Sequence, residues 1–366
     1  MAGLYVHIPF CRSRCIYCAF YSTTSLKWRD RYVDALCREW QMRRNELSQA
    51  IETIYLGGGT PSQLTPRQLS QLFSVLPGNA QEVTMEVNPD DVTAAYADLL
   101  QQLGVNRVSM GAQTFDDQRL RFLHRRHNAD QVSLAVQRLR DAGIHNISVD
   151  LMYGFPGERL ADWQHDIDAV LALDVEHISA YCLTIEEGTP LWKLTLDRGQ
   201  EFTMNEELER QMYETLIDQL TAAGYEHYEI SNFAKPGYRS RHNSSYWHDV
   251  PYVGLGAAAH SYDGHCRSWN VSNLQQYAEA IERAQLPSER EVLDADTHYN
   301  DRITTALRTS DGLDLTMLDE KYRRYCLHEA EPFIKDGLLR QDADRLILTR
   351  KGLFVSDMVM SSLMLV

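Results

Sequence analysis

Short apolar runs alternate with amphipathic stretches through the first half of the chain. The runs predict β-strands at residues 4–8, 53–56, 83–87, 107–110, 147–151 and 177–183. Between them, apolar residues recur at helical spacing in residues 26–47, 66–76, 94–103, 129–142 and 160–171. Strands that alternate with helices at this spacing run parallel and are joined by right-handed crossovers. The pattern therefore predicts an α/β fold, with a partial (β/α)6 TIM-like barrel as the preferred architecture and a doubly wound open sheet as the alternative.

The second half of the chain has a different character. Residues 226–290 are rich in Gly, His, Tyr and Trp and are typical of loops and short strands. Residues 291–366 look mainly helical, with a hairpin candidate at 338–339 and 346–348 before a last helix, which indicates a winged-helix-like module. We therefore expect a barrel over residues 1–225, a connecting region over 226–290 and a C-terminal module over 291–366.

Charge and cysteine content narrow the class of protein. The 366 residues include 36 Lys and Arg against 51 Asp and Glu, a formal charge of −15, which argues against a nucleic-acid ligand. No stretch approaches the roughly 20 apolar residues of a membrane helix, and the first residues lack the pattern of a signal peptide. Seven cysteines, three of them within eight residues, do not resemble a secreted disulfide framework. We expect a soluble, cytoplasmic protein.

Three cysteines lie directly after the first predicted strand, as Cys11-x3-Cys15-x2-Cys18. Thiolates this close together bind one metal centre, and soft sulfur ligands favour an iron–sulfur cluster or zinc. A structural zinc site closes its tetrahedron with a fourth ligand, but Ala19 and Phe20 follow here. We predict a 4Fe–4S cluster with one open iron. Structural zinc and three unrelated core cysteines are the alternatives.

Residues suited to binding a small molecule stand at the ends of the next predicted strands. In (β/α) barrels, ligands bind at the carboxyl ends of the strands. Here these ends carry residues 57–60 (Gly-Gly-Gly-Thr), then Glu86, Gln113 and Asp150. Each alone is more typical of a strand-end cap, but together they converge on one rim. Carboxylates such as Glu86 and Asp150 accept hydrogen bonds from ribose hydroxyls.

An arginine for a ligand carboxylate follows the fourth strand. Arg125 has the planar, two-pronged guanidinium that suits such a group. Its neighbours Arg126 and His127 are alternatives for the same role.

These motifs together resemble one known family. The cysteine loop is similar to that of the radical S-adenosylmethionine (SAM) superfamily. In that superfamily SAM chelates the open iron, and an electron from the cluster cleaves SAM to give a 5′-deoxyadenosyl radical. The segments around Tyr5, residues 57–61, Glu86, Gln113 and Asp150 resemble the coproporphyrinogen-oxidase-like branch over nearly the whole chain. The resemblance implies a SAM site made of Tyr5, Tyr17, Gly58, Gly59, Thr60, Glu86, Gln113, Arg125 and Asp150, with Cys182 and His260 near its far edge.

Two departures separate this chain from the oxygen-independent coproporphyrinogen III dehydrogenases of the family. Those enzymes carry a further cysteine two residues after the third, where this chain has Phe20, and a long N-terminal extension before the first strand. Residues 241–247 (Arg-His-Asn-Ser-Ser-Tyr-Trp) are instead similar to a His-Asn-x-x-Tyr-Trp motif of the family's haem chaperones. Imidazole is an axial ligand of haem iron, so His242 is the haem-ligand candidate.

The alternative for this motif is a loop packed by its own Tyr and Trp, and His248, His260 and His265 are competing haem ligands. The resemblance implies a haem chaperone, rather than an enzyme, that binds a 4Fe–4S cluster, SAM and haem. It implies haem-acceptor proteins as partners, membrane-associated ones included, and is compatible with a homodimer. The rival functions are a coproporphyrinogen III dehydrogenase, a related radical SAM methyltransferase, and a radical SAM enzyme that modifies nucleic acid.

Overall fold

The computed structural model describes residues 1–199 and 205–365, and its centre is a set of parallel strands. The six strands are β1 (Ala2–Ile8), β2 (Ile51–Gly58), β3 (Glu82–Val87), β4 (Arg107–Gln113), β5 (Asn146–Tyr153) and β6 (His177–Cys182). The helices between and after them are α1 (Arg29–Arg43), α2 (Pro66–Phe73), α3 (Ala94–Gln102), α4 (Asp117–Phe122), α5 (Ala129–Asp141), α6 (Leu160–Ala172), α7 (Pro190–Arg198) and α8 (Glu206–Ala222). The predicted barrel strands and helices are confirmed, with ends that differ by a few residues.

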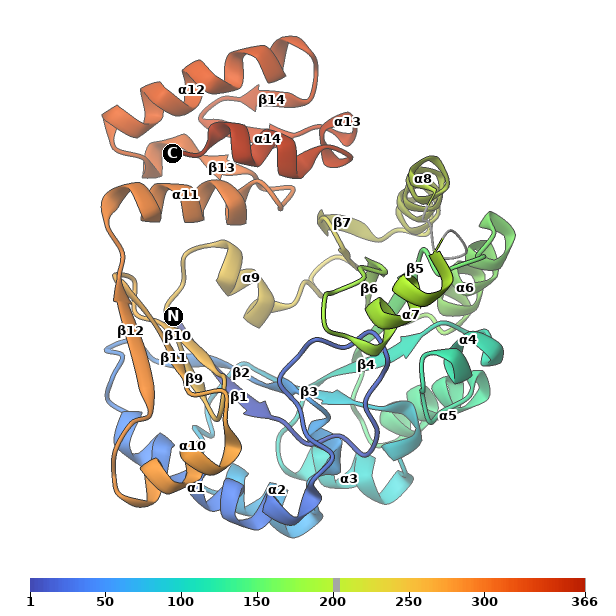
Figure 1. The fold of residues 1–366 in the computed structure, drawn as a ribbon, viewed down its shortest axis with the longest axis vertical. Helices are drawn as coiled ribbons and strands as arrows, with labels where there is room; N and C mark the ends of the chain where they lie inside the picture. Colours follow the sequence, from blue (N-terminus) through green and yellow to red (C-terminus); the bar gives the residue numbers. More distant parts are fainter. Residues whose placement is uncertain (200–204, 366) are drawn as a thin grey trace.

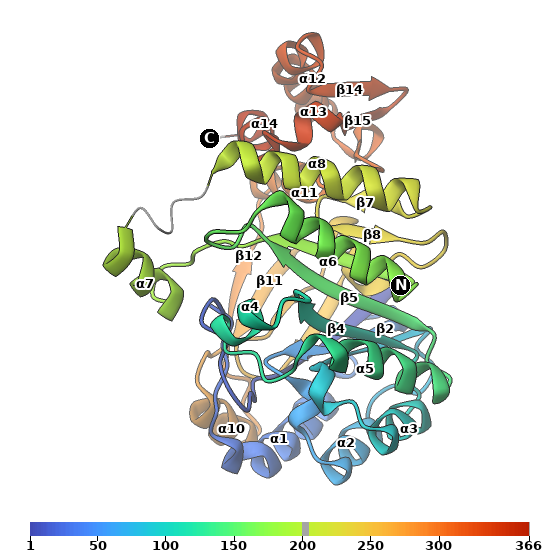
Figure 2. The ribbon, with the colours of Figure 1, turned by 90° about the vertical axis from the view of Figure 1, so that its right-hand side faces the viewer.

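The strands lie side by side in chain order, from β1 to β6. In a doubly wound sheet the order reverses at a switch point, so that helices cover both faces. Here the order does not reverse, and helices α1 to α6 lie along the outside of a curved sheet (Figures 1 and 2). The fold is therefore the partial barrel, and the doubly wound alternative is wrong.

Strands from the connecting region extend the sheet at both edges. At one edge β9 (Tyr252–Leu255) pairs in parallel with β1, and the antiparallel strands β10 (His260–Tyr262), β11 (Cys266–Asn270) and β12 (Ser288–Val292) follow. At the other edge β8 (Asn232–Ala234) and β7 (Glu226–Glu229) follow β6, antiparallel. With these edge strands, the sheet of the described residues has twelve strands, which we did not predict from the sequence. Helix α10 (Leu274–Glu282) packs against α1.

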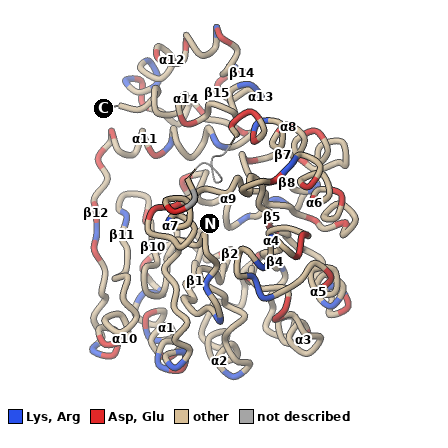
Figure 3. The backbone as a smooth tube through the Cα atoms, turned by 45° about the vertical axis from the view of Figure 1, so that its right-hand side comes forward, with Lys and Arg blue, Asp and Glu red and all other residues tan. Residues whose placement is uncertain are grey.

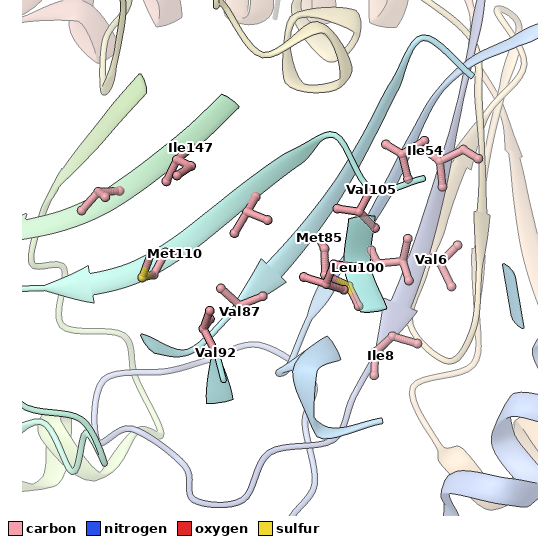
Figure 4. Packing of buried hydrophobic residues seen from close by; sticks show 14 of the residues in the cluster. Val6, Ile8, Ile54, Met85, Val87, Val92, Leu100, Val105, Met110 and Ile147 are labelled. Atoms are coloured by element: carbon pink, nitrogen blue, oxygen red, sulfur yellow. The ribbon is translucent and has the colours of Figure 1, made fainter. Parts of the chain in front are cut away.

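The hydrophobic core lies between the sheet and the outer helices. Side chains such as Val6, Ile54, Met85 and Met110 belong to this layer, and Leu100 of α3 lies beside Met85 (Figure 4). The alternate positions point the other way, into the barrel, because successive side chains of a strand face opposite sides. These inward positions are largely polar, so the interior of the barrel is suited to a ligand and the apolar core lies outside it. The inward residues include Tyr55, Glu86, Arg107, Ser109, Asp150 and Ser179.

The C-terminal residues form a module with its own apolar cluster. It consists of α11 (Ala295–Ala306), β13 (Leu313–Asp314), α12 (Glu320–Lys335), β14 (Leu339–Asp342), β15 (Arg345–Leu348), α13 (Arg350–Leu353) and α14 (Ser356–Leu363). Strands β14 and β15 form the predicted hairpin. Asp249, near the barrel, binds Arg302 of α11 at 2.9 Å and His298 at 3.1 Å, which ties the module to the barrel. The module lies above α9 (Arg241–Trp247) in Figure 1.

Charged residues of both signs are spread over the outer helices and the C-terminal module (Figure 3). None of the helices within the described ranges has the length and apolar character needed to cross a membrane.

Candidate functional site

The cysteine loop leaves the end of β1 and is fastened at both ends. The Cys11 amide donates to the Thr23 carbonyl at 2.9 Å, and the Thr23 amide donates to the Pro9 carbonyl at 2.7 Å. In the middle of the loop, Ile16 is buried in a small apolar cluster with Leu123 and Leu191. These contacts position the loop at the end of β1.

All three cysteines of the loop line one large cavity, of about 690 Å³. The seven cysteines of the chain all lie in its described part, and each is a free thiol. The Thr60 hydroxyl donates to the Cys11 sulfur at 3.5 Å, and Arg125 Nη1 donates to the Cys15 sulfur at 3.5 Å. Burial raises the pKa of Cys11, and the bond from Thr60 offsets part of that rise. Donors to sulfur favour the thiolate, which is the form that binds metal.

The donor set fits an iron–sulfur cluster. Within residues 1–199 and 205–365, no three His, Cys, Asp or Glu side chains are gathered in the way a single metal ion requires. A 4Fe–4S cluster distributes its thiolate ligands over different iron atoms, so its cysteines need to border one space without converging on one point. Cys11, Cys15 and Cys18 do border one space, and Phe20 is 70% exposed at its edge.

The glycines after β2 are held close to β1. A Cβ on Gly59 would lie 2.8 Å from the Ile8 carbonyl oxygen, and one on Gly58 would lie 2.3 Å from the His7 ring. Gly58 also has a backbone φ of +107°, which residues other than glycine rarely adopt. The Gly59 amide donates to the Ile8 carbonyl at 2.9 Å. These glycines therefore let the β2 end pack against the start of the cysteine loop, and Gly58, Gly59 and Thr60 line the cavity there.

The two predicted carboxylates both face the cavity. Glu86 accepts hydrogen bonds from the Tyr55 hydroxyl at 2.8 Å and the Gly58 amide at 3.1 Å. Burial raises the pKa of Glu86 to about 7, and the nearby charge of Asp150 adds to the rise. Asp150 accepts from Ser109 at 3.1 Å, and burial raises its pKa too. Both acids keep free lone pairs for the hydroxyls of a ligand.

Gln113 and Arg125 complete the wall of the cavity near the cysteine loop. Gln113 has φ +70° at the end of β4, and its side-chain oxygen accepts from the Tyr17 hydroxyl at 3.1 Å. Arg125 donates to the Asn88 side chain at 2.7 Å and to the Gly111 carbonyl. Its Nε has no partner among the described residues and is free for a ligand. A strained non-glycine backbone such as that of Gln113 is typical of functional sites.

The alternatives to Arg125 are engaged elsewhere. Arg126 forms ion pairs with Asp90 and Asp91, both at 3.0 Å. His127 is buried, and its Nε2 lies 3.0 Å from the Ala112 carbonyl. His127 Nδ1, like Arg125 Nε, has no hydrogen-bond partner among the described residues, so the choice of Arg125 stays a prediction.

Three predicted residues do not line the cavity: Tyr5, His260 and His242, the last of which is described below. Tyr5 lies behind Tyr55, with the ring centroids 6.2 Å apart, and its hydroxyl is 3.0 Å from His7 Nδ1. Tyr55 lines the cavity in its place. His260 lies exposed on β10 beside Trp269, whereas Cys182 does line the cavity. The role of Tyr5 in binding SAM therefore stays a prediction without support from the geometry.

His242 is buried in α9, at the end of the barrel opposite the cysteine loop. Its Nδ1 lies 2.8 Å from the Thr53 hydroxyl and its Nε2 lies 2.9 Å from the Tyr246 hydroxyl. Burial lowers the pKa of His242 to about 3, so the ring is neutral. A neutral ring is the form that binds metal, but both nitrogens have partners here, so ligation of haem requires one partner to move. Asn243, the next residue, faces the cavity.

Several cavity residues were not predicted from the sequence. Tyr55, Arg107, Ser109, Ser179 and Tyr181 all line it. The sequence pattern that could have identified them is a polar residue at every second position of an otherwise apolar strand, as in Arg107-Val-Ser109-Met-Gly-Ala-Gln113. This alternation marks the inward face of each strand.

Comparisons with known proteins agree with this geometry. The family model of the radical SAM superfamily matches residues 5–170, and that of the HemN C-terminal domain matches residues 293–355. The chain is 35% identical to a haem chaperone HemW of Bacillus subtilis, over 98% of both chains. It is 36% identical to a haem chaperone HemW of Escherichia coli, over 70% of this chain and 69% of that protein.

Among solved structures, the fold is similar to that of coproporphyrinogen III oxidase (HemN) from Escherichia coli. The TM-score is 0.83 at 23% identity, and the match covers 99% of this chain and 89% of that one. At this identity the likeness shows the shared fold.

Proposed function

Because the chain belongs to the HemW family of haem chaperones, within the radical SAM superfamily, we propose that it is itself a haem chaperone. It binds a 4Fe–4S cluster, SAM and haem, and it passes haem to acceptor proteins. The observation that carries this proposal is the single cavity in which three cysteine thiols and the strand-end ligand residues meet.

The residues near the cysteine loop would hold the cluster and SAM. Cys11, Cys15 and Cys18 would bind three irons of the cluster, which in radical SAM proteins supplies an electron to SAM. Thr60 and Arg125 donate hydrogen bonds to two of the sulfurs and offset part of their negative charge. Glu86 and Asp150 would accept hydrogen bonds from ribose hydroxyls, and Gln113, Tyr17, Gly58 and Gly59 would border the same ligand.

Haem would use the remaining part of the cavity. The whole cavity, which would also hold the cluster and SAM, has a volume of about 690 Å³. Phe20 and Tyr181 border it, with 70% and 43% of their surface exposed, and flat aromatic rings suit the face of a porphyrin. His242 is the proposed iron ligand, after the Tyr246 hydroxyl moves away from Nε2.

A haem-transfer assay tests this function. Anaerobically purified, cluster-loaded protein is titrated with haem and then mixed with a haem-free globin, while the Soret band is followed. We expect binding at a defined stoichiometry and transfer of the Soret signal to the globin. The same preparation is given SAM, a reductant and coproporphyrinogen. Steady formation of protoporphyrinogen would identify a dehydrogenase, and transfer of a methyl group from SAM to a tetrapyrrole would identify a methyltransferase; either would replace the chaperone proposal.

The cellular setting is part of the same proposal. Reduced thiols and an acidic charge balance are typical of a cytoplasmic protein, which would deliver haem to acceptors in the cytoplasm or at a membrane surface. Light scattering with and without haem measures whether haem loading produces a homodimer.

A further inference from the structure

Arg107 is a buried guanidinium that faces the cavity without a protein partner. It is the first residue of β4 and is 1% exposed, and neither Nε nor Nη1 has a hydrogen-bond partner among the described residues. Thr84, its register neighbour on β3, is fully buried, and its hydroxyl also lacks a partner in that part of the chain. Register neighbours point to the same side of a sheet. Two unsatisfied polar groups therefore face one part of the barrel interior.

The acids nearby do not satisfy this guanidinium. Burial raises the pKa of Glu86 and of Asp150, and the charge of Arg107 offsets only part of each rise. Their carboxylates instead accept from neutral donors, which are Tyr55 and Gly58 for Glu86 and the serine hydroxyls for Asp150. Asp150 is the nearby opposite charge, but buried N–H groups without a hydrogen-bond partner are unfavourable, which favours an anionic group that binds there.

Arg107 lies far from the cysteine end of the cavity. It stands six residues before Gln113 on β4, which places the two α-carbons about 20 Å apart at the rise of a β-strand. Helix α9 covers this distant end: the His242 amide donates to Glu82 at the start of β3, and Asn243 lines the cavity. We call this end, formed by Arg107, Thr84 and Asn243, the barrel floor.

We propose that Arg107 binds a carboxylate of the ligand that reaches the barrel floor, and that this carboxylate is a propionate of haem. The identity of the ligand rests on the proposed function. The carboxylate of SAM is the other source of this chemistry, but the family resemblance places it on the cluster, at the opposite end of the cavity. A planar guanidinium donates charge-assisted hydrogen bonds to a carboxylate, and Nε and Nη1 of Arg107 have no partner among the described residues.

Haem and its dimethyl ester, in which both propionates are neutral, test the assignment without altering the protein. We expect the wild-type protein to bind haem at least about tenfold more tightly than the ester, since a charge-assisted hydrogen bond contributes on that scale. Arg107→Met removes the guanidinium and should erase this preference. Arg107→Lys keeps the charge but loses the two-pronged geometry, and it should retain part of the preference. Arg126→Gln is the matched control: it removes a cation of the same cavity whose partners are Asp90 and Asp91, and the preference should persist.

The outcomes separate this inference from the proposed function. Equal binding of haem and ester by the wild-type protein, or an unchanged preference in Arg107→Met, would overturn the role of Arg107 and leave haem binding intact. Binding of SAM by the cluster-loaded Arg107→Met protein is measured in parallel; a loss of SAM affinity with the haem preference unchanged would assign Arg107 to SAM. Failure of the wild-type protein to bind haem would overturn both proposals.

Discussion

Glu86 gives the ligand-free protein a pH dependence that can be measured directly. Burial raises the pKa of Glu86 from 4.5 to about 7. An acid with a raised folded-state pKa destabilises the folded state as it ionises, so its penalty is absent below pH 4.5, grows as pH rises, and is complete above pH 7. At about 1.4 kcal/mol per pKa unit, the full penalty is about 3.5 kcal/mol. The side chain borders an open cavity, so this value is an upper bound.

The substitution Glu86→Gln removes the ionisable group and nearly preserves its volume. We compare the free energy of unfolding of wild type and variant in urea at pH 5 and pH 8, without cluster or SAM. Loss of the hydrogen bond from the Gly58 amide is expected to affect the variant equally at both pH values, so it cancels in the difference. The variant should gain up to about 2.5 kcal/mol relative to wild type between pH 5 and pH 8, because a small part of the penalty is already present at pH 5.

Asp150→Asn is the companion variant, because the charge of Asp150 raises the pKa of Glu86. In that background, the pH-dependent gain from Glu86→Gln should be smaller. If the difference in unfolding free energy between wild type and Glu86→Gln is the same at pH 5 and pH 8, or changes in the opposite direction, then burial does not raise the pKa of Glu86 and the reasoning is refuted.

Two further predictions concern the bound groups. Cys15→Ser should give protein deficient in iron and sulfide after reconstitution. Cys37 is a buried cysteine away from the cavity, so Cys37→Ser should keep the wild-type iron and sulfide content. Full iron and sulfide in Cys15→Ser would show that Cys15 is not a ligand. His242→Ala should weaken haem binding and change the haem absorption spectrum, and Tyr246→Phe, which frees His242 Nε2, should strengthen binding. An unchanged spectrum and affinity in His242→Ala would leave that residue with the structural role its contacts to Thr53 and Tyr246 suggest.

The barrel was predictable because its strands are apolar on the face that packs against the helices. Val6, Ile54 and Met85 belong to that face, and a run of such residues is visible in any sequence. The edge strands were not predicted, because β9 is only four residues long and owes its place to β1, some 250 residues earlier. Short strands of that kind carry little local signal and form through distant partners.

Part of the candidate site could likewise be predicted from the sequence and part could not. The cysteine loop and the strand-end acids follow from position along the chain, since the ends of parallel strands meet at one rim. The partners of His242 do not, because Thr53 is 189 residues away and only the folded chain brings them together. Arg107 lay in a predicted strand but was not predicted as a site residue. Only the hydrogen-bond partners of its guanidinium distinguish a structural arginine from a ligand-binding one, and the sequence does not show them.

The pairing of β9 with β1 also bears on how the protein is made. The strand that leads into the cysteine loop is synthesised first, yet one of its two neighbours is complete only when Leu255 has left the ribosome. Until then a nascent chain exposes an open edge of β1, of the kind that recruits other chains into aggregates. Fragments that stop before β9 keep that edge permanently, so the full sheet is completed late in translation.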